Sequence, residues 1–326
     1  MLLALPVVLA LLMLTHLAWA SSDNGNSVQP NNPDCRTYDC ERHSITGLSV
    51  GSPASLPDAL DAFYAHPVDP EKIVVMWLGN GVGEWSGYGS SGILLKTDSR
   101  VVLLDPADIV SGTNVQKLQR LDALLVTHEH TDHFSKSATI SIQSRTDAVV
   151  VCNSGVYTQL DGSLPFDKLV RMRSGEARTI LDIEILAMAS IHLGNEPLTF
   201  LLLFGDFSVF HGSDSGFNSD LNNYKGRAKL ALVPTGGASP TASPEEAVKM
   251  VKTLEPTDVI PMHGTEPQNA RLGDLLAQQS PNVRYLRPQA LSSLVVNEFY
   301  GVGFLALLAS VSAFSCARRL QRHERR

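Results

Sequence analysis

Two stretches of the 326-residue chain contain no charged residue at all. The first is residues 1–20, where a leucine-rich run ends on Ala18-Trp19-Ala20. An apolar run that ends with two small residues separated by one residue of any type predicts a secretory signal peptide with its cleavage site. Lysine and arginine are also absent from its start, where a signal peptide usually has one, so an uncleaved N-terminal anchor is the alternative.

The second uncharged stretch is residues 299–317, and a tail with five arginines, residues 318–326, follows it directly. Its length is close to the ~20 apolar residues that cross a bilayer as a helix, and arginines favour the cytoplasmic side. We therefore expect a transmembrane helix with the body of the protein outside the cytoplasmic membrane. A buried C-terminal helix, or a sorting signal that is cut and replaced by another anchor, would show the same pattern.

The body of the protein has little positive charge. The formal net charge of the chain is −7, and residues 318–326 contribute five arginines and one glutamate, or +4, so the preceding residues carry −11. A body this acidic repels phosphate backbones, which argues against nucleic acid as a partner.

Cysteine is scarce, with four residues in the chain. Cys35 and Cys40 lie close together, and outside the cytoplasm such a pair predicts a small disulfide loop rather than a metal site. Cys152 lies in an apolar run and is interpreted as a packed core thiol. Cys316, at the end of the second uncharged stretch, is a site where acylation would be chemically feasible.

The rest of the sequence predicts one large domain, residues 46–298, preceded by a polar spacer at residues 21–45. Within it we expect a helix near residues 56–65, strands over residues 73–78, 92–96, 101–105, 122–127, 147–151 and 183–189, and a hairpin that turns at Gly205-Asp206. Further helices are expected at residues 114–121 and 244–254, with strands at 230–234 and 259–262. Strands and helices alternate in two similar halves.

One segment of this domain, residues 127–133, is dense in metal-ligand residue types: His128, His130, Asp132 and His133. Imidazole and carboxylate groups suit zinc or a similar divalent metal. At an extended strand end His128 and His130 project to the same side, and a turn would aim Asp132 and His133 at a second point. The spacing therefore favours two metal ions. Glu129 points the opposite way and is interpreted as exposed or packed.

The pattern His128-x-His130-x-Asp132-His133 resembles the defining motif of the metallo-β-lactamase-fold hydrolases. The resemblance continues in order through Asp105, which ends an early strand, and through three later residues, His192, Asp214 and His263. It implies an α/β fold, a four-layer αββα sandwich, with one metal on His128, His130 and His192 and another on Asp132, His133 and His263. Asp214 would bridge the two ions, with His211 as a neighbouring partner rather than a ligand.

Within that superfamily, residues 234–237 and 259–265 are similar to the branch with ascorbate-6-phosphate lactonase and N-acyl-phosphatidylethanolamine phospholipase D type enzymes. Ser213 departs from the glycine that usually precedes the bridging aspartate in this superfamily. The glycine-rich residues 81–91 form either a substrate loop or a solvent loop.

The resemblance implies a metal-dependent hydrolase that uses a metal-bound hydroxide, with Asp132 assisting proton transfer. Zinc is the expected metal, with manganese and iron as alternatives, and the substrate is a lactone, ester, amide or phosphodiester of small-molecule or lipid-like type. No Gly-x-Ser-x-Gly motif stands where this chemistry would occur. A surface metal-binding or ligand-binding protein without turnover is the main alternative, and the acidic body, the signal and the lack of a long inserted domain disfavour a nuclease.

Overall fold

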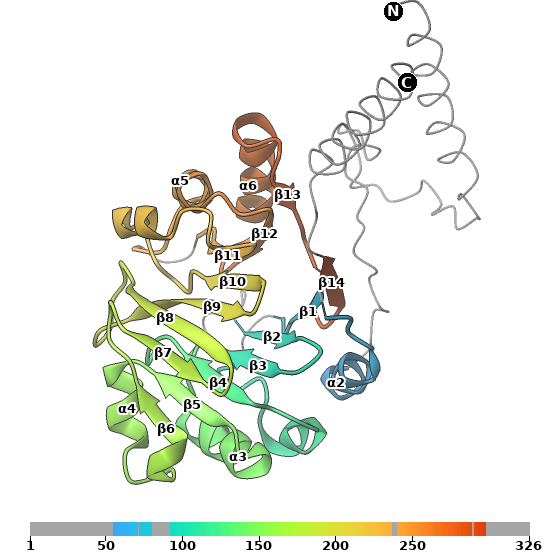
Figure 1. Ribbon diagram of the computed structural model, residues 1–326, viewed down its shortest axis with the longest axis vertical. Helices are drawn as coiled ribbons and strands as arrows, with labels where there is room; N and C mark the ends of the chain where they lie inside the picture. The colour runs from blue at the N-terminus through green and yellow to red at the C-terminus, as the bar shows by residue number, and fades with distance from the viewer. Residues whose placement is uncertain (1–54, 71, 80–91, 237–239, 289, 298–326) are drawn as a thin grey trace, which may run out of the picture. The chain divides into compact units, whose positions relative to one another are not determined.

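The computed structural model describes residues 55–70, 72–79, 92–236, 240–288 and 290–297, all within the second of two compact units, Ile45–Arg326 (Figure 1). Two seven-stranded sheets form its centre. The first sheet has the order β14 (Ser293–Asn297), β1 (Lys72–Trp77), β2 (Ile93–Lys96), β3 (Val101–Leu104), β4 (Ala123–Val126), β5 (Val149–Cys152) and β6 (Leu169–Arg171).

The second sheet has the order β13 (Arg284–Tyr285), β12 (Asp258–Met262), β11 (Leu230–Pro234), β10 (Phe207–His211), β9 (Leu198–Phe204), β8 (Ile183–Ala189) and β7 (Ala177–Ile180). Each sheet is mixed. Strands β3 to β6 are parallel, as are β10 to β13, while the remaining pairs are antiparallel. The parallel strands therefore end at one edge of each sheet, where ligand-binding loops collect.

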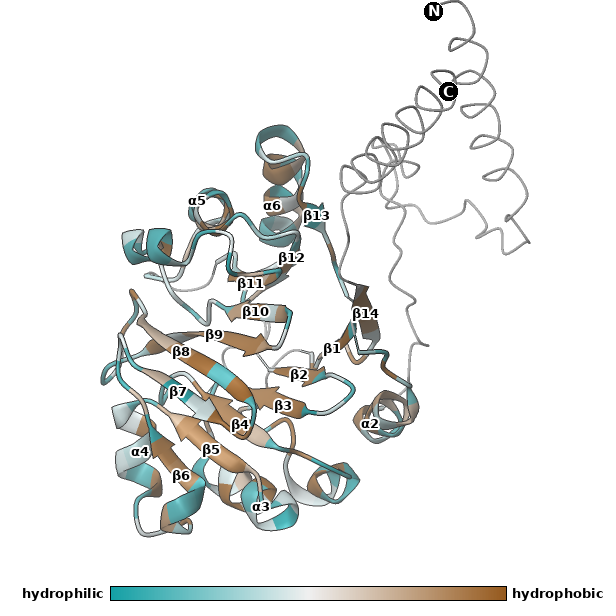
Figure 2. Cartoon of the chain, viewed as in Figure 1, coloured by the Kyte–Doolittle hydropathy of each residue, from teal (hydrophilic) through white to brown (hydrophobic). Residues whose placement is uncertain are grey.

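Alternating side chains along the strands build the layers. In β3, Val102 and Leu104 enter a core that also contains Phe200 and Leu202 of β9, whereas Val101 and Leu103 face the helices on the other side. Successive side chains of a strand point to opposite faces, so the central strands of each sheet are buried on both faces, whereas the edge strand β7 is mostly exposed. The strands are brown along most of their length in Figure 2, which marks this apolar interior.

Helices cover the outer face of each sheet. The first sheet packs against α2 (Leu56–Ala65), η1 (Gly112–Lys117), α3 (Lys136–Thr146) and α4 (Ser154–Leu160), with the short η2 (Phe166–Lys168) before β6. The second packs against η3 (Ser219–Tyr224), α5 (Pro244–Leu254) and α6 (Glu266–Gln279). Two mixed sheets between helical layers are the predicted αββα sandwich.

The prediction of a helix at residues 114–121 is wrong. Only a 3-10 helix, η1, forms there, and Leu118 is already extended, with φ −70° and ψ 105°. Val115 and Leu118 both enter the core, and their spacing of three residues matches the 3-10 period. By contrast, α2 and α5 begin and end at the expected residues.

Several expectations fall on residues that the structure does not describe. They are the signal peptide at residues 1–20, the spacer at 21–45 with Cys35 and Cys40, the glycine-rich residues 81–91, the membrane helix at 299–317 and the tail at 318–326. Among the described helices none is both long and apolar enough to cross a membrane.

Candidate metal centre

Strand β4 leads directly into the histidine-rich loop. The four candidate metal ligands of this loop lie within six positions. Three of them are buried: His128, Asp132 and His133. The loop turns sharply, because the backbone N–H groups of His133 and Phe134 both donate to the carbonyl oxygen of His130, at 3.0 and 2.8 Å. Because of this turn, His128 and His130 point in a different direction from Asp132 and His133.

Three other strands deliver the remaining candidate residues. His192 follows β8, Asp214 follows β10 and His263 follows β12, each just beyond the last residue of its strand. Ser213 and His263 both have left-handed backbone conformations, with φ 50° and 47°. Such conformations are uncommon outside glycine and collect at functional sites. The seven predicted metal ligands therefore meet at one edge, although they come from four segments of the chain.

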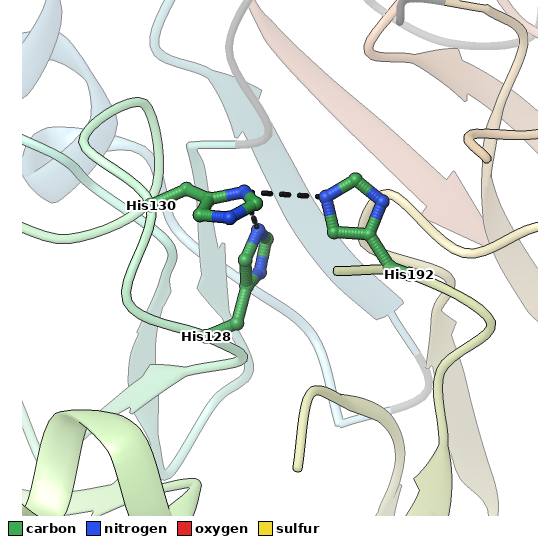
Figure 3. Close-up of side chains that lie close together, drawn as sticks. All are labelled: His128, His130 and His192. Carbon is green, nitrogen blue, oxygen red and sulfur yellow. Dashed lines mark hydrogen bonds between the residues drawn. The ribbon is translucent and has the colours of Figure 1, made fainter. Parts of the chain in front are cut away.

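The first cluster contains His128, His130 and His192 (Figure 3). Nδ1 of His130 lies 3.0 Å from Nε2 of His128 and 3.2 Å from Nε2 of His192. Ligand atoms around a tetrahedral zinc with Zn–N near 2.0–2.1 Å are about 3.3 Å apart, so these two distances are close to those within such a site.

The second cluster contains Asp132, His133, Asp214 and His263. Nε2 of His263 lies 3.1 Å from Oδ2 of both Asp132 and Asp214, and Nε2 of His133 lies 2.9 Å from Oδ1 of Asp214. The structure thus groups Asp214 with the second cluster. Oδ2 of Asp214 is also 3.7 Å from Nε2 of His192, so this carboxylate reaches toward the first cluster as well.

Hydrogen bonds to the other ring nitrogen orient three of these histidines. Nδ1 of His133 faces the carboxylate of Asp105, Nδ1 of His263 faces the carbonyl oxygen of Gly236, and Nδ1 of His128 faces Oγ1 of Thr127, each at 3.0 Å. A carbonyl or carboxylate oxygen only accepts, so His133 and His263 carry a proton on Nδ1. Nε2 of each ring is left to face its cluster, which is how outer groups orient metal-binding histidines.

The aspartate at the end of β3 joins these parts and was not singled out as a site residue from the sequence. Asp105 is fully buried and accepts hydrogen bonds from the N–H and hydroxyl of Thr127, both at 2.8 Å, from Nδ1 of His133 and from Nε2 of His211 at 2.8 Å. His211 and His133 therefore share Asp105 as a partner, and His211 is in neither cluster. An aspartate placed directly after a buried strand was the signal for Asp105.

The carboxylates of the site are held in their ionised form. Burial alone would raise the pKa of Asp214, but the charges of His133 and His263 hold it well below its usual range. Burial likewise opposes ionisation of Asp132 and Asp105, and their histidine partners outweigh it, so the pKa of each is lowered.

The histidines divide into two groups. Burial lowers the pKa of His128 and of His192, with the charge of His133 adding to the effect on His128. Burial also opposes the charged forms of His133 and His263, but Asp214 raises the pKa of both, assisted by Asp105 at His133 and by Asp132 at His263.

Positive charge stabilises the buried carboxylates. In the protein without metal, protons on His133 and His263 provide this charge. Nε2 of His133 has no hydrogen bond of good geometry to any described residue, although it is buried and 2.9 Å from Asp214. Divalent cations would supply the same charge and displace those protons, since metal ligands bind in their deprotonated form. The donor set of imidazole and carboxylate groups fits two such ions.

A model of the β-lactamase superfamily domain matches residues 100–264, about half of the chain. A UPF0173 protein of Pyrococcus abyssi is 32% identical over 179 residues, which are 54% of this chain and 80% of that protein. The chain belongs to the β-lactamase superfamily. A UPF0173 metal-dependent hydrolase of Caldivirga maquilingensis is 28% identical over 196 residues, 58% of this chain and 84% of the relative.

Solved structures share the β-lactamase fold. Igni18, a metallo hydrolase of Ignicoccus hospitalis, matches with a TM-score of 0.57 and 20% identity over 70% of this chain and 99% of its own. YhfI of Bacillus subtilis, a metallo-β-lactamase fold protein, matches with a TM-score of 0.55 and 15% identity over 69% of this chain and 100% of its own.

The same fold carries other metal chemistry. CmlA, a diiron β-hydroxylase of Streptomyces venezuelae, matches with a TM-score of 0.53 and 15% identity over 72% of this chain and 56% of its own. The family confirms the expected enzyme class, a metal-dependent hydrolase of the metallo-β-lactamase superfamily. Neither the fold nor the His and Asp donors select between zinc, manganese and iron.

Proposed function

We propose that the protein binds two divalent metal ions and hydrolyses a lactone, ester, amide or phosphodiester. One observation carries this proposal: two clusters of ligand atoms lie side by side, and the carboxylate of Asp214 reaches both. Zinc is the proposed metal, with manganese or iron as alternatives. His128, His130 and His192 would hold one ion, and Asp132, His133 and His263 the other, with Asp214 between them.

Two such ions would lower the pKa of bound water from 15.7 toward about 7 and would polarise the bond under attack. The chain supplies the proton acceptor. Asp132, whose carboxylate lies among the ligand atoms of the second cluster, would take part in proton transfer from the attacking water. Burial opposes the charged form of Asp132, but its histidine partners outweigh this effect and lower its pKa, so the carboxylate is ionised at neutral pH.

The substrate is proposed to be a small or lipid-like molecule with an apolar part. Ile191 and Leu193, on either side of His192, are 46% and 64% exposed, which is unusual for large apolar side chains in this domain. An exposed apolar rim beside a polar site favours a substrate that buries hydrocarbon there.

We further propose that the enzyme acts outside the cytoplasmic membrane and is tethered to it by residues 299–317. The uncharged stretches at residues 1–20 and 299–317, together with the arginine-rich tail, support this placement. A membrane-tethered enzyme would meet lipid-like substrates at the bilayer surface.

Elemental analysis and an activity screen test this proposal together. The purified protein should contain about two divalent ions, and it should hydrolyse members of a panel of lactones, esters, amides and bis-p-nitrophenyl phosphate supplied with zinc or manganese. His130→Ala should lose at least one ion and lower activity at least about 100-fold, because a ligand of the first cluster is removed.

His66→Ala, which removes a histidine at the end of α2, is the matched control and should keep both ions and activity. Activity in protein stripped of metal would refute the mechanism. Full occupancy by two ions without turnover on the whole panel would instead support a ligand-binding protein on the same fold.

A further inference from the structure

Glu129 lies between two candidate ligands, yet its side chain reaches away from both clusters to two distant segments. Oε1 accepts a hydrogen bond from the backbone N–H of Asn195 at 2.6 Å, and Oε2 accepts one from Nδ2 of Asn153 at 3.0 Å. Hydrogen bonds to an ionised carboxylate are stronger than those between neutral groups. The interpretation of Glu129 as merely exposed or packed is therefore incomplete.

Asn153 links Glu129 to the segment that contains Asn195. Its side chain is fully buried, and Nδ2 also donates to the carbonyl oxygen of Asn195 at 2.8 Å, while Oδ1 accepts from the N–H of Val156 at 2.9 Å and caps α4. Both backbone polar groups of Asn195 are consequently held, one by Glu129 and one by Asn153. Asn195 is three residues after His192.

Two glycines leave the space that the Glu129 carboxylate occupies. A Cβ atom at Gly155 would lie 2.2 Å from Oε2 of Glu129, far inside contact distance. At Gly194 the Cβ would be 3.4 Å from Oε1, and the backbone there has φ +134°, which favours glycine. The chain after His192 can thus turn back over the carboxylate.

His192 lacks the outer hydrogen bond that orients three other histidines of the site. Nδ1 of His192 is buried and has no hydrogen-bond partner among the described residues, whereas Nδ1 of His128, His133 and His263 each has one. The His192 ring contacts the rings of His128 and His130, and otherwise its position depends on its backbone. That backbone is fixed before the ring by Ile191, whose N–H donates to Oγ of Ser215 at 2.9 Å, and after it by the contacts of Asn195.

We infer that Glu129 is a positioning residue, which together with Asn153 holds the His192 loop so that Nε2 of His192 faces the first metal cluster. This inference rests on the proposed metal function. Metal affinity of the first cluster should therefore depend on Glu129, although Glu129 touches no ligand atom of either cluster. The second cluster should be much less affected.

Glu129→Gln in the full-length protein tests this role. Glutamine has nearly the same shape, but its NH₂ group must face either the Asn195 N–H or Nδ2 of Asn153, so one donor meets a donor. Titration of the metal-stripped variant with Co²⁺ should show one equivalent bound as in the wild type and the other bound about 10- to 100-fold more weakly. The visible cobalt spectrum should lose the part that arises from the weakened site.

A second measurement needs no metal. Hydrogen exchange of the Asn195 amide in metal-stripped protein should be about tenfold faster in Glu129→Gln, because its charge-assisted hydrogen bond is lost. Gly155→Ala should act in the same direction, since its Cβ displaces the carboxylate while alanine favours the helix, so α4 itself is preserved.

Glu184→Gln, which removes the same charge from an exposed position on β8, is the matched control and should match the wild type in both measurements. Unchanged cobalt binding and unchanged Asn195 exchange in Glu129→Gln would overturn the inference. Failure of the wild type to bind cobalt would overturn the proposed metal function instead, and the exchange measurement would still show whether Glu129 holds the loop.

Discussion

Cys152 lies at the end of β5 and is fully buried among apolar side chains of the first sheet and its helices. Burial raises the pKa of its thiol to about 12, and the charge of Arg171 opposes this only in part. Thiolate is the reactive form, so Cys152 should not react with a thiol reagent in the folded protein at pH 8. A variant with serine at Cys35, Cys40 and Cys316 isolates this thiol, which should react fully once urea unfolds the chain.

The same pKa shift has a consequence for stability. In the unfolded chain the thiol ionises near its ordinary pKa, about 8.5, whereas the folded protein keeps the proton up to about pH 12. The stabilising effect is therefore complete below pH 8 and is lost as the pH rises. Above pH 9 the unfolding free energy should fall by up to about 1.4 kcal/mol per pH unit more than in Cys152→Ala. Parallel pH profiles of the two proteins would contradict the assignment.

At the residue scale, part of the candidate metal site could be recognised from spacing along the chain. His128, His130, Asp132 and His133 are neighbours in the sequence, so their pattern is visible without a fold. The role of Glu129 was not predictable, because its partners at Asn153 and Asn195 lie 24 and 66 residues away. Which carboxylate oxygen meets which histidine depends on turns that only the folded chain defines.

Lys96, at the end of β2, stabilises helix α2 from outside the helix. It is 7% exposed, and Nζ donates to the carbonyl oxygens of Phe63, Tyr64 and His66, at 2.5, 3.1 and 2.6 Å. The last turn of α2 contains no basic residue of its own, so Lys96 satisfies carbonyls that the helix leaves free. Lys96→Met should lower the unfolding free energy by about 2–4 kcal/mol, measured by urea denaturation.

Lys117→Met is the control for this element. Lys117 of η1 forms an ion pair with Asp61 of α2 at 2.5 Å, but both side chains are more than a third exposed. Exposed pairs contribute little, so the loss should stay below about 1 kcal/mol. Equal losses in the two variants would mean that Lys96 has no special role at the end of α2.

At the element scale, local signals predicted the elements whose ends are marked in the sequence. Helix α5 begins with Pro244 after the cap Ser243, whose hydroxyl accepts from the N–H of Glu246, and the hairpin turns at Gly205-Asp206 as expected. Strand β14 was not predicted, because it is defined by its pairing with β1, with Val74 opposite Val295. Pairing across so many residues leaves no local pattern.

At the scale of the whole molecule, the proposed ions would join segments from both sheets. The β4 loop belongs to the first sheet, and His192, Asp214 and His263 follow strands of the second. An ion that binds only the folded chain, present at 100 times its dissociation constant, adds about 2.7 kcal/mol of stability. Removal of metal with EDTA should therefore lower the melting temperature by at least about 5 °C, measured by calorimetry.

His130→Ala provides the comparison for this prediction. It lacks one ligand of the first cluster, so EDTA should lower its melting temperature by a smaller amount than in the wild type. Identical melting temperatures with and without EDTA in the wild type would contradict a role for the ions in holding the two sheets together.

The αββα arrangement was predictable only through resemblance of the histidine motif to a known family. Apolar runs predicted most strands, but two sheets buried on both faces give continuous apolar strands whose facing partners cannot be read from the sequence. The order of strands in each sheet, and hence the meeting of four segments at one edge, follows from pairing between distant parts of the chain.

The hairpin between β9 and β10 has a practical consequence. Because β9 begins beside the histidine-rich loop, with the N–H of Leu198 bonded to the carbonyl of Thr127 at 3.1 Å, its turn at Gly205-Asp206 lies at the far end of the strand. The turn before β8, at Leu181, is on that same distant side and is 53% exposed. A fluorophore or surface linker attached at either turn should leave catalysis unaffected. The enzyme could therefore be immobilised with the edge that contains the two clusters facing the solution.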